Sequence, residues 1–175
     1  ALIGFSLGGN LTLKYLGECS RDLHPGIRKA VTFSVPCDLR SGSLQLASLT
    51  NQIYMRHFLL SLRQKIRAKM KSMPVRTFKD FDDRYTAPIH GFADAEDYWR
   101  QCSCRPTLKN ISIPTLLINA RNDPFLAEPC YPVAEAEANP NLHLEMPASG
   151  GHVGFITLNQ QGEYWSESRA LAFLK

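Results

Sequence analysis

Apolar residues along the chain follow two patterns, and these patterns predict alternating strands and helices. Short runs rich in β-branched and apolar residues, bounded by glycine, proline or polar residues, stand at 1–3, 29–35, 114–119 and 142–146. Stretches with apolar residues three or four positions apart stand at 7–17, 131–138 and 161–174. Because a strand that is followed by a helix and another strand returns parallel to the first, we expect an α/β fold with a mostly parallel sheet flanked by helices.

The stretch from 41 to 105 fits poorly into such a sheet. Apolar residues at helical spacing predict an amphipathic helix or helix pair over 41–73, which Pro74 ends. The segment 77–92 mixes aromatic residues with turn formers, and a short helix is expected around 93–102. The chain therefore divides into a first core segment, a helical insertion and a second core segment, at 1–40, 41–105 and 106–175.

Composition is that of an ordinary folded protein. The 175 residues are 44% hydrophobic and 21% charged, and no apolar run approaches the length of a membrane-spanning helix. The cysteines are odd in number and match neither a disulfide framework nor a paired zinc motif, which predicts reduced thiols and a cytoplasmic location: Cys19, Cys37, Cys102, Cys104 and Cys130. A lone C-x-C pair at 102 and 104 could bind a metal or exchange disulfides, but small buried thiols are the favoured interpretation.

Positive charge is concentrated in the insertion. Residues 39–79 contain nine lysines and arginines and no acidic residue, so the rest of the chain is net acidic. A basic amphipathic helix over 56–71 could make peripheral contact with an anionic membrane or an acidic partner, although a merely solvated helix face is the favoured alternative. Nucleic acid is disfavoured, because the charge is confined to one helix and no stacking aromatics interleave with it.

Ser6 lies in a Gly-x-Ser-x-Gly motif directly after the first predicted strand. Such a strand, turn and helix arrangement is typical of a nucleophile elbow, which exposes the serine hydroxyl above the sheet. Gly4 and Gly8 are expected to be small because side chains there would meet as the chain reverses. The N–H of Leu7, at the start of the new helix, is a candidate oxyanion donor.

A serine hydroxyl needs an imidazole to accept its proton and a carboxylate to orient that imidazole. Asp123 and His152 supply these groups in turns that follow the strands at 114–119 and 142–146, so the order is serine, acid, histidine. A turn aspartate before proline and a surface histidine are the alternatives for these two residues. Asp38, which follows the strand at 29–35, is a second and weaker candidate acid.

Four segments resemble the YheT-like branch of the α/β hydrolases. They are Gly-Phe-Ser-Leu-Gly-Gly-Asn at 4–10, Phe-Asp-Asp-Arg-Tyr-Thr-Ala-Pro-Ile-His-Gly-Phe at 81–92, Ala-Arg-Asn-Asp-Pro-Phe at 120–125 and Gly-Gly-His-Val-Gly-Phe at 150–155. The resemblance implies part of an α/β-hydrolase fold with a helical lid inserted at 41–105. It also implies a serine hydrolase of lipid or short-chain acyl esters that uses Ser6, Asp123 and His152 and needs no cofactor or metal.

Hydrolases of this family place several strands, and a second oxyanion donor, before the elbow. We therefore expect that an N-terminal part of the core precedes Ala1, and that the 175-residue chain alone has an unpaired first strand, is prone to aggregation and is inactive. Two other functions stay open: acyl transfer on the same triad, and non-catalytic binding to a membrane or partner through the basic helix.

Overall fold

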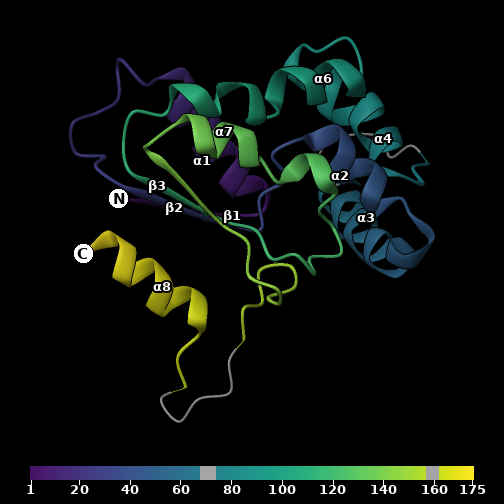
Figure 1. Cartoon of the computed structure of the whole chain (residues 1–175). Coiled ribbons are helices and arrows are strands. Elements are labelled where there is room, and N and C mark those ends of the chain that lie inside the picture. The colour runs from purple at the N-terminus through teal and green to yellow at the C-terminus, as the bar shows by residue number, and fades with distance from the viewer. Residues whose placement is uncertain (68–73, 157–161) are drawn as a thin grey trace.

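The computed structural model describes residues 1–67, 74–156 and 162–175 and contains one sheet of four parallel strands (Figure 1). The strands are β1 (Leu2–Phe5), β2 (Ala30–Phe33), β3 (Thr115–Ile118) and β4 (Leu142–Glu145), in the spatial order β1-β2-β3-β4. Each pairs in parallel with the next, so all four carboxyl ends reach the same edge. The expected α/β class is confirmed.

Helices cover both faces of the sheet because alternate strand residues point to opposite sides. On one face lie α1 (Leu7–Glu18), the 3₁₀ helix η3 (Arg105–Asn110) and α7 (Val133–Ala138), and α8 (Trp165–Leu174) lies on the other (Figure 1). One buried apolar cluster joins Leu13 and Leu16 of α1 to Leu117 and Leu142 of the sheet. A second buried cluster joins Ala170 of α8 to other strand residues.

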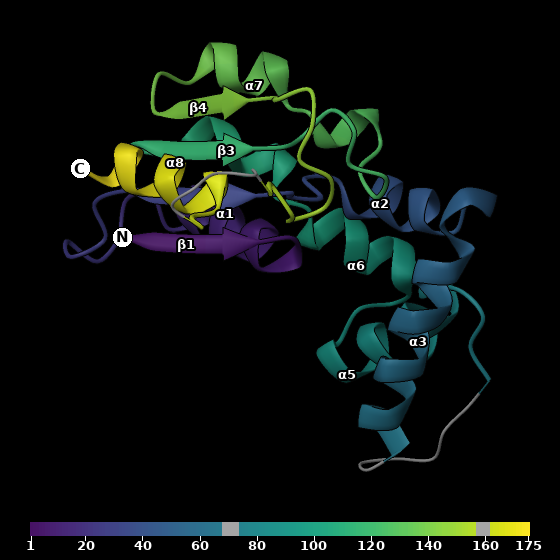
Figure 2. The same ribbon diagram turned by 90° about the horizontal axis from the view of Figure 1, so that it is seen from below.

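Residues 39–67 and 74–102 extend beyond the carboxyl edge of the sheet (Figure 2). They form α2 (Leu39–Leu46), η1 (Leu49–Asn51), α3 (Gln52–Arg67), α4 (Phe78–Phe81), the π-helix η2 (Asp82–Thr86), α5 (Ala87–His90) and α6 (Ala95–Cys102). Met55, Leu59, Val75, Phe81 and Tyr85 form a separate apolar cluster there. Along the chain, one further short element, η4 (Glu128–Cys130), lies between β3 and α7.

The structure differs from the sequence expectation most clearly in the segment 77–92. We expected turns, but residues 78–90 are continuously helical. Thr77 and Asp80 form a capping box that starts the helix, and Gly91, with φ of 79°, ends it. The expected helix over 41–73 is two helices and a 3₁₀ turn, and its last residues, 68–73, lie outside the described ranges. Among the described helices, none has the length and hydropathy to cross a bilayer.

Candidate active site

Ser6 occupies a sharp turn between β1 and α1. Its backbone has φ of 50° and ψ of −125°, a conformation that non-glycine residues rarely adopt, and its N–H donates a hydrogen bond to the Phe33 carbonyl at 2.8 Å. The turn is therefore held against the end of β2, and the serine stands at the carboxyl edge of the sheet.

The glycines around Ser6 do not all act as expected. A Cβ at Gly4 would lie 2.8 Å from the Gly9 Cα, so Gly4 is needed for the reversal. The expectation for Gly8 is wrong, because a Cβ there would meet nothing within 4 Å. Gly9 is the restricted position instead: its Cβ would lie 2.5 Å from Cγ2 of Val35, so a small residue lets α1 approach the chain leaving β2.

Asp123 lies in the tight turn that follows β3. Its N–H donates to the Ala120 carbonyl at 3.1 Å, and its Oδ1 accepts the Phe125 N–H at 2.9 Å. The side chain has no exposed surface. A buried carboxylate in this setting keeps a fixed orientation, because its own turn holds one of its two oxygens.

His152 lies in the turn after β4, and this turn is tied to its neighbours. Oδ1 of Asn122 accepts the N–H groups of Gly150 at 3.0 Å and Gly151 at 2.9 Å. The Val153 N–H donates to Oγ of Ser34 at 2.9 Å. Val153 itself has φ of 58°, which is strained for a β-branched residue.

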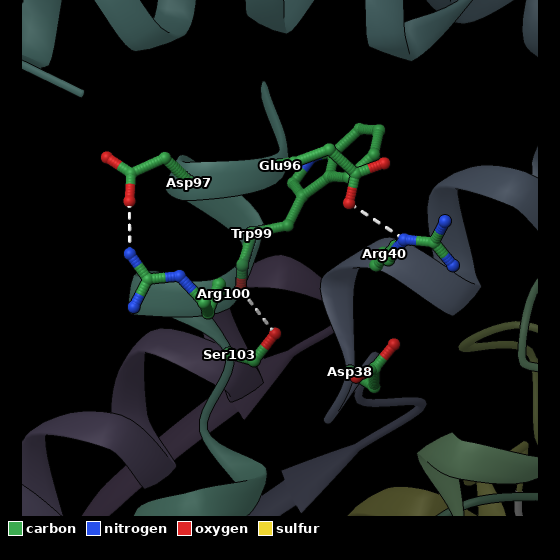
Figure 3. Close-up of a pocket in the computed structure, with 7 residues that line it drawn as sticks. All are labelled: Asp38, Arg40, Glu96, Asp97, Trp99, Arg100 and Ser103. Carbon is green, nitrogen blue, oxygen red and sulfur yellow. Dashed lines mark hydrogen bonds and ion pairs between the residues drawn. The ribbon is translucent and has the colours of Figure 1, made fainter. Parts of the chain in front are cut away.

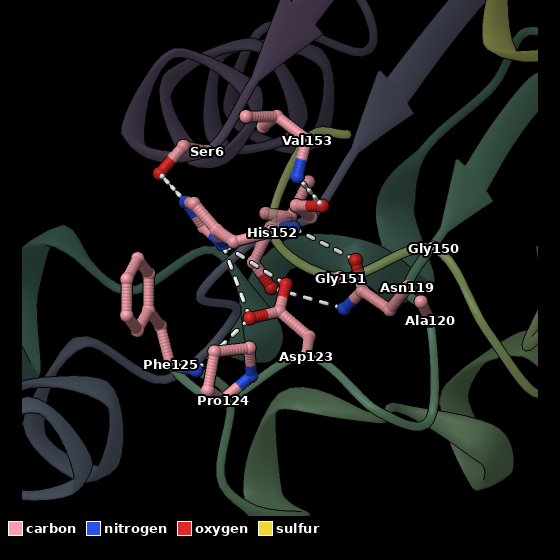
Figure 4. Close-up of polar contacts among 12 residues, drawn as sticks. Ser6, Asn119, Ala120, Asp123, Pro124, Phe125, Gly150, Gly151, His152 and Val153 are labelled. Carbon is pink, nitrogen blue, oxygen red and sulfur yellow. Dashed lines mark hydrogen bonds and ion pairs between the residues drawn. The ribbon is translucent and has the colours of Figure 1, made fainter. Parts of the chain in front are cut away.

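These turns bring the three predicted side chains into one hydrogen-bonded line (Figure 4). Nε2 of His152 lies 2.9 Å from Oγ of Ser6, and Nδ1 lies 2.9 Å from Oδ2 and 3.2 Å from Oδ1 of Asp123. An ionised carboxylate can only accept, so Nδ1 carries the proton and Nε2 is left to accept the serine hydroxyl hydrogen. The Phe125 ring packs beside the imidazole, with a distance of 4.6 Å between the ring centroids and an angle of 51° between the ring planes.

The oxyanion donor expected at Leu7 stands at the first position of α1, where backbone N–H groups have no partner within the helix. No hydrogen bond to this N–H is found among the described residues. Its role as an oxyanion donor stays a prediction.

A cavity of about 530 Å³ opens beside Ser6 and His152. Its walls come mainly from the helices at 39–102, and many of its side chains are apolar, including Leu39, Leu46, Phe58, Phe81 and Leu126. Such a wall suits the hydrocarbon part of a ligand. The domain boundaries at 41 and 105, and the function of this segment as a lid, stay predictions.

A second cavity, of about 390 Å³, contains none of the three aligned residues (Figure 3). Ion pairs between Arg40 and Glu96 and between Arg100 and Asp97 cross its walls. Asp38 also lines it, and this weaker candidate acid caps α2 by accepting the Ser41 N–H at 2.7 Å. Asp38 is therefore occupied away from His152.

The remaining chemical candidates have ordinary contacts. All five cysteines are free thiols, and Cys37, Cys104 and Cys130 are buried. A hydrogen bond with Cys104, together with burial, raises the pKa of the Cys37 thiol well above its usual value, and burial raises the pKa of the Cys130 thiol. Within the described ranges, no group of three or more His, Cys, Asp or Glu side chains is arranged to hold a metal ion.

Sequence reasoning missed three residues that position the aligned side chains. Asn119, fully buried, accepts the Val35 N–H at 2.7 Å and donates to the carbonyls of Val35 and Cys130. Asn122 and Ser34 hold the histidine turn, as described above. The polar turn at 120–124 in the sequence could have indicated the role of Asn122. Nothing in the sequence around Ser34 indicates that this serine contacts the histidine turn.

The chain is similar in sequence to several known proteins, although no family model matches it. YheT of Escherichia coli (strain K12) is 37% identical over 97% of this chain and 53% of its own length. Phospholipase ABHD3 of Mus musculus is 32% identical over 87% of this chain and 39% of its own length. The chain thus spans about half the length, or less, of these relatives.

Solved structures show the same fold at low sequence identity. The Pyrococcus furiosus esterase Pf2001 has a TM-score of 0.53 and 20% identity, over 98% of this chain and 51% of that one. The esterase domain of a Rhodothermus marinus protein has a TM-score of 0.51 and 16% identity, over 99% and 60%. Together with the parallel sheet, these matches show an α/β-hydrolase fold, and in sequence the chain is similar to YheT over nearly its whole length.

Proposed function

We propose that this chain carries the catalytic residues of a serine hydrolase of carboxylic esters, with Ser6 as nucleophile, His152 as base and Asp123 as the orienting acid. The observation that supports this most strongly is the continuous line from Oγ of Ser6 through both imidazole nitrogens to a buried carboxylate. A surface histidine or a structural turn aspartate would not need this arrangement.

In the first half of the reaction, Nε2 of His152 takes the hydroxyl proton as Oγ of Ser6 forms a bond to the ester carbonyl carbon. The carbonyl oxygen becomes an oxyanion, which the Leu7 N–H stabilises by donating a hydrogen bond. The imidazolium then returns its proton to the alkoxide oxygen as the carbon–oxygen bond breaks. The alcohol leaves, and an acyl ester remains on Ser6.

In the second half, water replaces the alcohol. Nε2 of His152 accepts a proton from water, the hydroxide attacks the acyl carbon, and the proton passes to Oγ of Ser6 as the acid leaves. Asp123 keeps its charge throughout and holds the Nδ1 proton in place. No cofactor or metal takes part in the proposed steps.

The substrate class is proposed from the cavity and from the relatives. The apolar wall beside Ser6 suits an acyl chain. One relative carries the name phospholipase, and a Saccharomyces cerevisiae relative, 27% identical over 99% of this chain, carries the name monoacylglycerol lipase. We infer a lipid or short-chain acyl ester as substrate, and a cytoplasmic location stays a prediction.

The proposal is tested with a fluorophosphonate probe on the protein at its natural length. We expect the probe to label Ser6, labelling to vanish in Ser6→Ala, and labelling to persist in Ser61→Ala, since Ser61 lines the same cavity whereas Ser6 is the serine bonded to His152. No labelling, or labelling that survives Ser6→Ala, would overturn the proposal. Release of acid in water, against ester formation with added alcohol, separates hydrolysis from acyl transfer on the same residues.

Peripheral membrane binding is a second candidate because apolar side chains are exposed along η1 and α3. Leu49 of η1 is 92% exposed, and Ile53 and Leu60 of α3 are 81% and 57% exposed. The spacing of Ile53, Arg56 and Leu60 places these three on one side of α3. We expect Ile53→Ser with Leu60→Ser to reduce sedimentation with vesicles that contain anionic lipid. Equal sedimentation of the double variant and the unsubstituted protein would remove this candidate.

A further inference from the structure

A buried carboxylate that the proposed reaction does not use lines the same cavity as Ser6 and His152. This residue, Asp82, is the first residue of η2 and is only 9% exposed. The hydrogen bond from the Ala87 N–H to the Asp82 carbonyl is the i+5 bond of a π-helix, a local widening that is frequent at functional sites.

Within the part of the chain that the structure describes, two neutral side chains donate hydrogen bonds to the Asp82 carboxylate. Oγ1 of Thr86 donates to Oδ1 at 2.6 Å, and Nε1 of Trp99 donates to Oδ2 at 2.8 Å. None of the ion pairs within the described ranges includes Asp82. Burial raises the pKa of this carboxyl, and the charge on Asp83 adds to the effect.

Each oxygen of this carboxylate keeps acceptor capacity after taking one hydrogen bond. A ligand hydroxyl can donate to it when it is ionised and accept from it when it is protonated, so a hydroxyl is matched to both states. Many side chains that line the cavity with Asp82 are apolar, including Phe81, its neighbour in the chain, and Leu62 of α3. The cavity therefore combines many apolar side chains with the carboxylate of Asp82, and Lys65 and Ser61 line it as well.

We infer that Asp82 is a substrate-recognition residue that binds a free hydroxyl on the alcohol part of the ester. The acyl chain would then contact the apolar wall, and the hydroxyl would contact Asp82, while the ester carbonyl lies at Ser6. This inference rests on the proposed function for its orientation of the substrate, but the binding of a hydroxyl to Asp82 can be measured without any reaction.

The test uses two ligands that cannot be hydrolysed, octyl glyceryl ether and octyl propyl ether, which differ in the two hydroxyls. Their Kd values are measured by calorimetry on the natural protein. We expect the glyceryl ether to bind about tenfold more tightly, and Asp82→Asn to reduce this preference below about threefold while the propyl ether binds as before. Ser43→Ala, which removes a different hydroxyl from the lining of the same cavity and leaves Asp82 with both of its donors, is the matched control and should keep the preference.

Equal affinity of the unsubstituted protein for the two ethers would overturn the inference, whether or not the Asp82 variant folds. So would an Asp82→Asn variant that loses affinity for both ethers equally, since that result indicates a purely structural link between η2 and α6. The probe experiment on Ser6 is independent of these measurements. Labelled Ser6 with no ether preference would refute the role of Asp82 alone, and a clear preference with unlabelled Ser6 would refute catalysis alone.

Discussion

The change Asp123→Asn should reverse the direction of the hydrogen bond to His152. Oδ1 of Asp123 accepts the Phe125 N–H at 2.9 Å, so the asparagine must keep its carbonyl oxygen there. Its NH₂ group then takes the place of Oδ2, 2.9 Å from Nδ1. Because an NH₂ group can only donate, Nδ1 becomes the acceptor, and the ring proton moves to Nε2, which faces Ser6.

An imidazole with its proton on Nε2 cannot take the serine proton. A tautomer change of this kind lowers kcat about 10⁴-fold, which corresponds to about 5.5 kcal/mol of transition-state stabilisation. The fold should change little, because the asparagine keeps its shape and its bond to Phe125. The measurement is kcat for a chromogenic ester, with the thermal midpoint recorded beside it.

Asp38→Asn is the matched control for this experiment. Asp38 was the weaker candidate acid, and asparagine caps a helix about as well as aspartate, so the bond to the Ser41 N–H is preserved. We expect kcat to change by less than about twofold. A folded Asp123→Asn protein with kcat within about tenfold of the unsubstituted protein would refute the assigned role of Asp123.

Three further predictions concern stability and access. Gly9→Ala should destabilise the protein by about 1–3 kcal/mol, because its Cβ would clash with Val35, which follows β2. Gly8→Ala should be neutral or stabilising by up to about 1 kcal/mol, because a Cβ there meets no other atom. Equal free energies of unfolding for the two variants in urea would contradict the importance of the contact between Gly9 and Val35. Iodoacetamide should modify partly exposed Cys19 well before buried Cys37 and Cys130, whose pKa values are raised, and mass spectrometry showing equal rates would contradict this burial. The 175-residue chain expressed alone should aggregate, because β1 is an edge strand with half-exposed apolar side chains, and a monomer that melts cooperatively would be the opposite outcome.

The sequence predicted the sheet because strand and helix patterns are local. All four strands and α1 were expected within about two residues of their observed bounds, and the order of Ser6, Asp123 and His152 indicated which turns belong together. That these turns meet follows from parallel pairing, which places every carboxyl end at one edge. This is a rule of topology that needs no distant side-chain contact.

Features that depend on distant contacts could not be predicted in this way. Gly9 is restricted by Val35, which belongs to another element, so the motif alone wrongly pointed to Gly8. The helical segment 78–90 is stabilised by the bond between Asp82 and Trp99, 17 positions along the chain. The sequence gives no sign of the role of Ser34, because this role comes from the hydrogen bond that the Val153 N–H of the distant histidine turn donates to its Oγ.

The bonds from Gly150 and Gly151 to Asn122 join the acid and base turns into one mechanical unit. Asn122 is the neighbour of Asp123 in the chain, so these two hydrogen bonds couple the position of the Asp123 turn to that of the His152 turn. Ser6, in contrast, lies between β1 and α1, and β1 is two strands away in the sheet from β3, which precedes Asp123. The serine turn and the histidine turn are both bonded to the end of β2, through the Phe33 carbonyl and Oγ of Ser34. A transfer of this site to another scaffold should therefore move residues 120–125 and 148–155 as a pair, together with the end of β2.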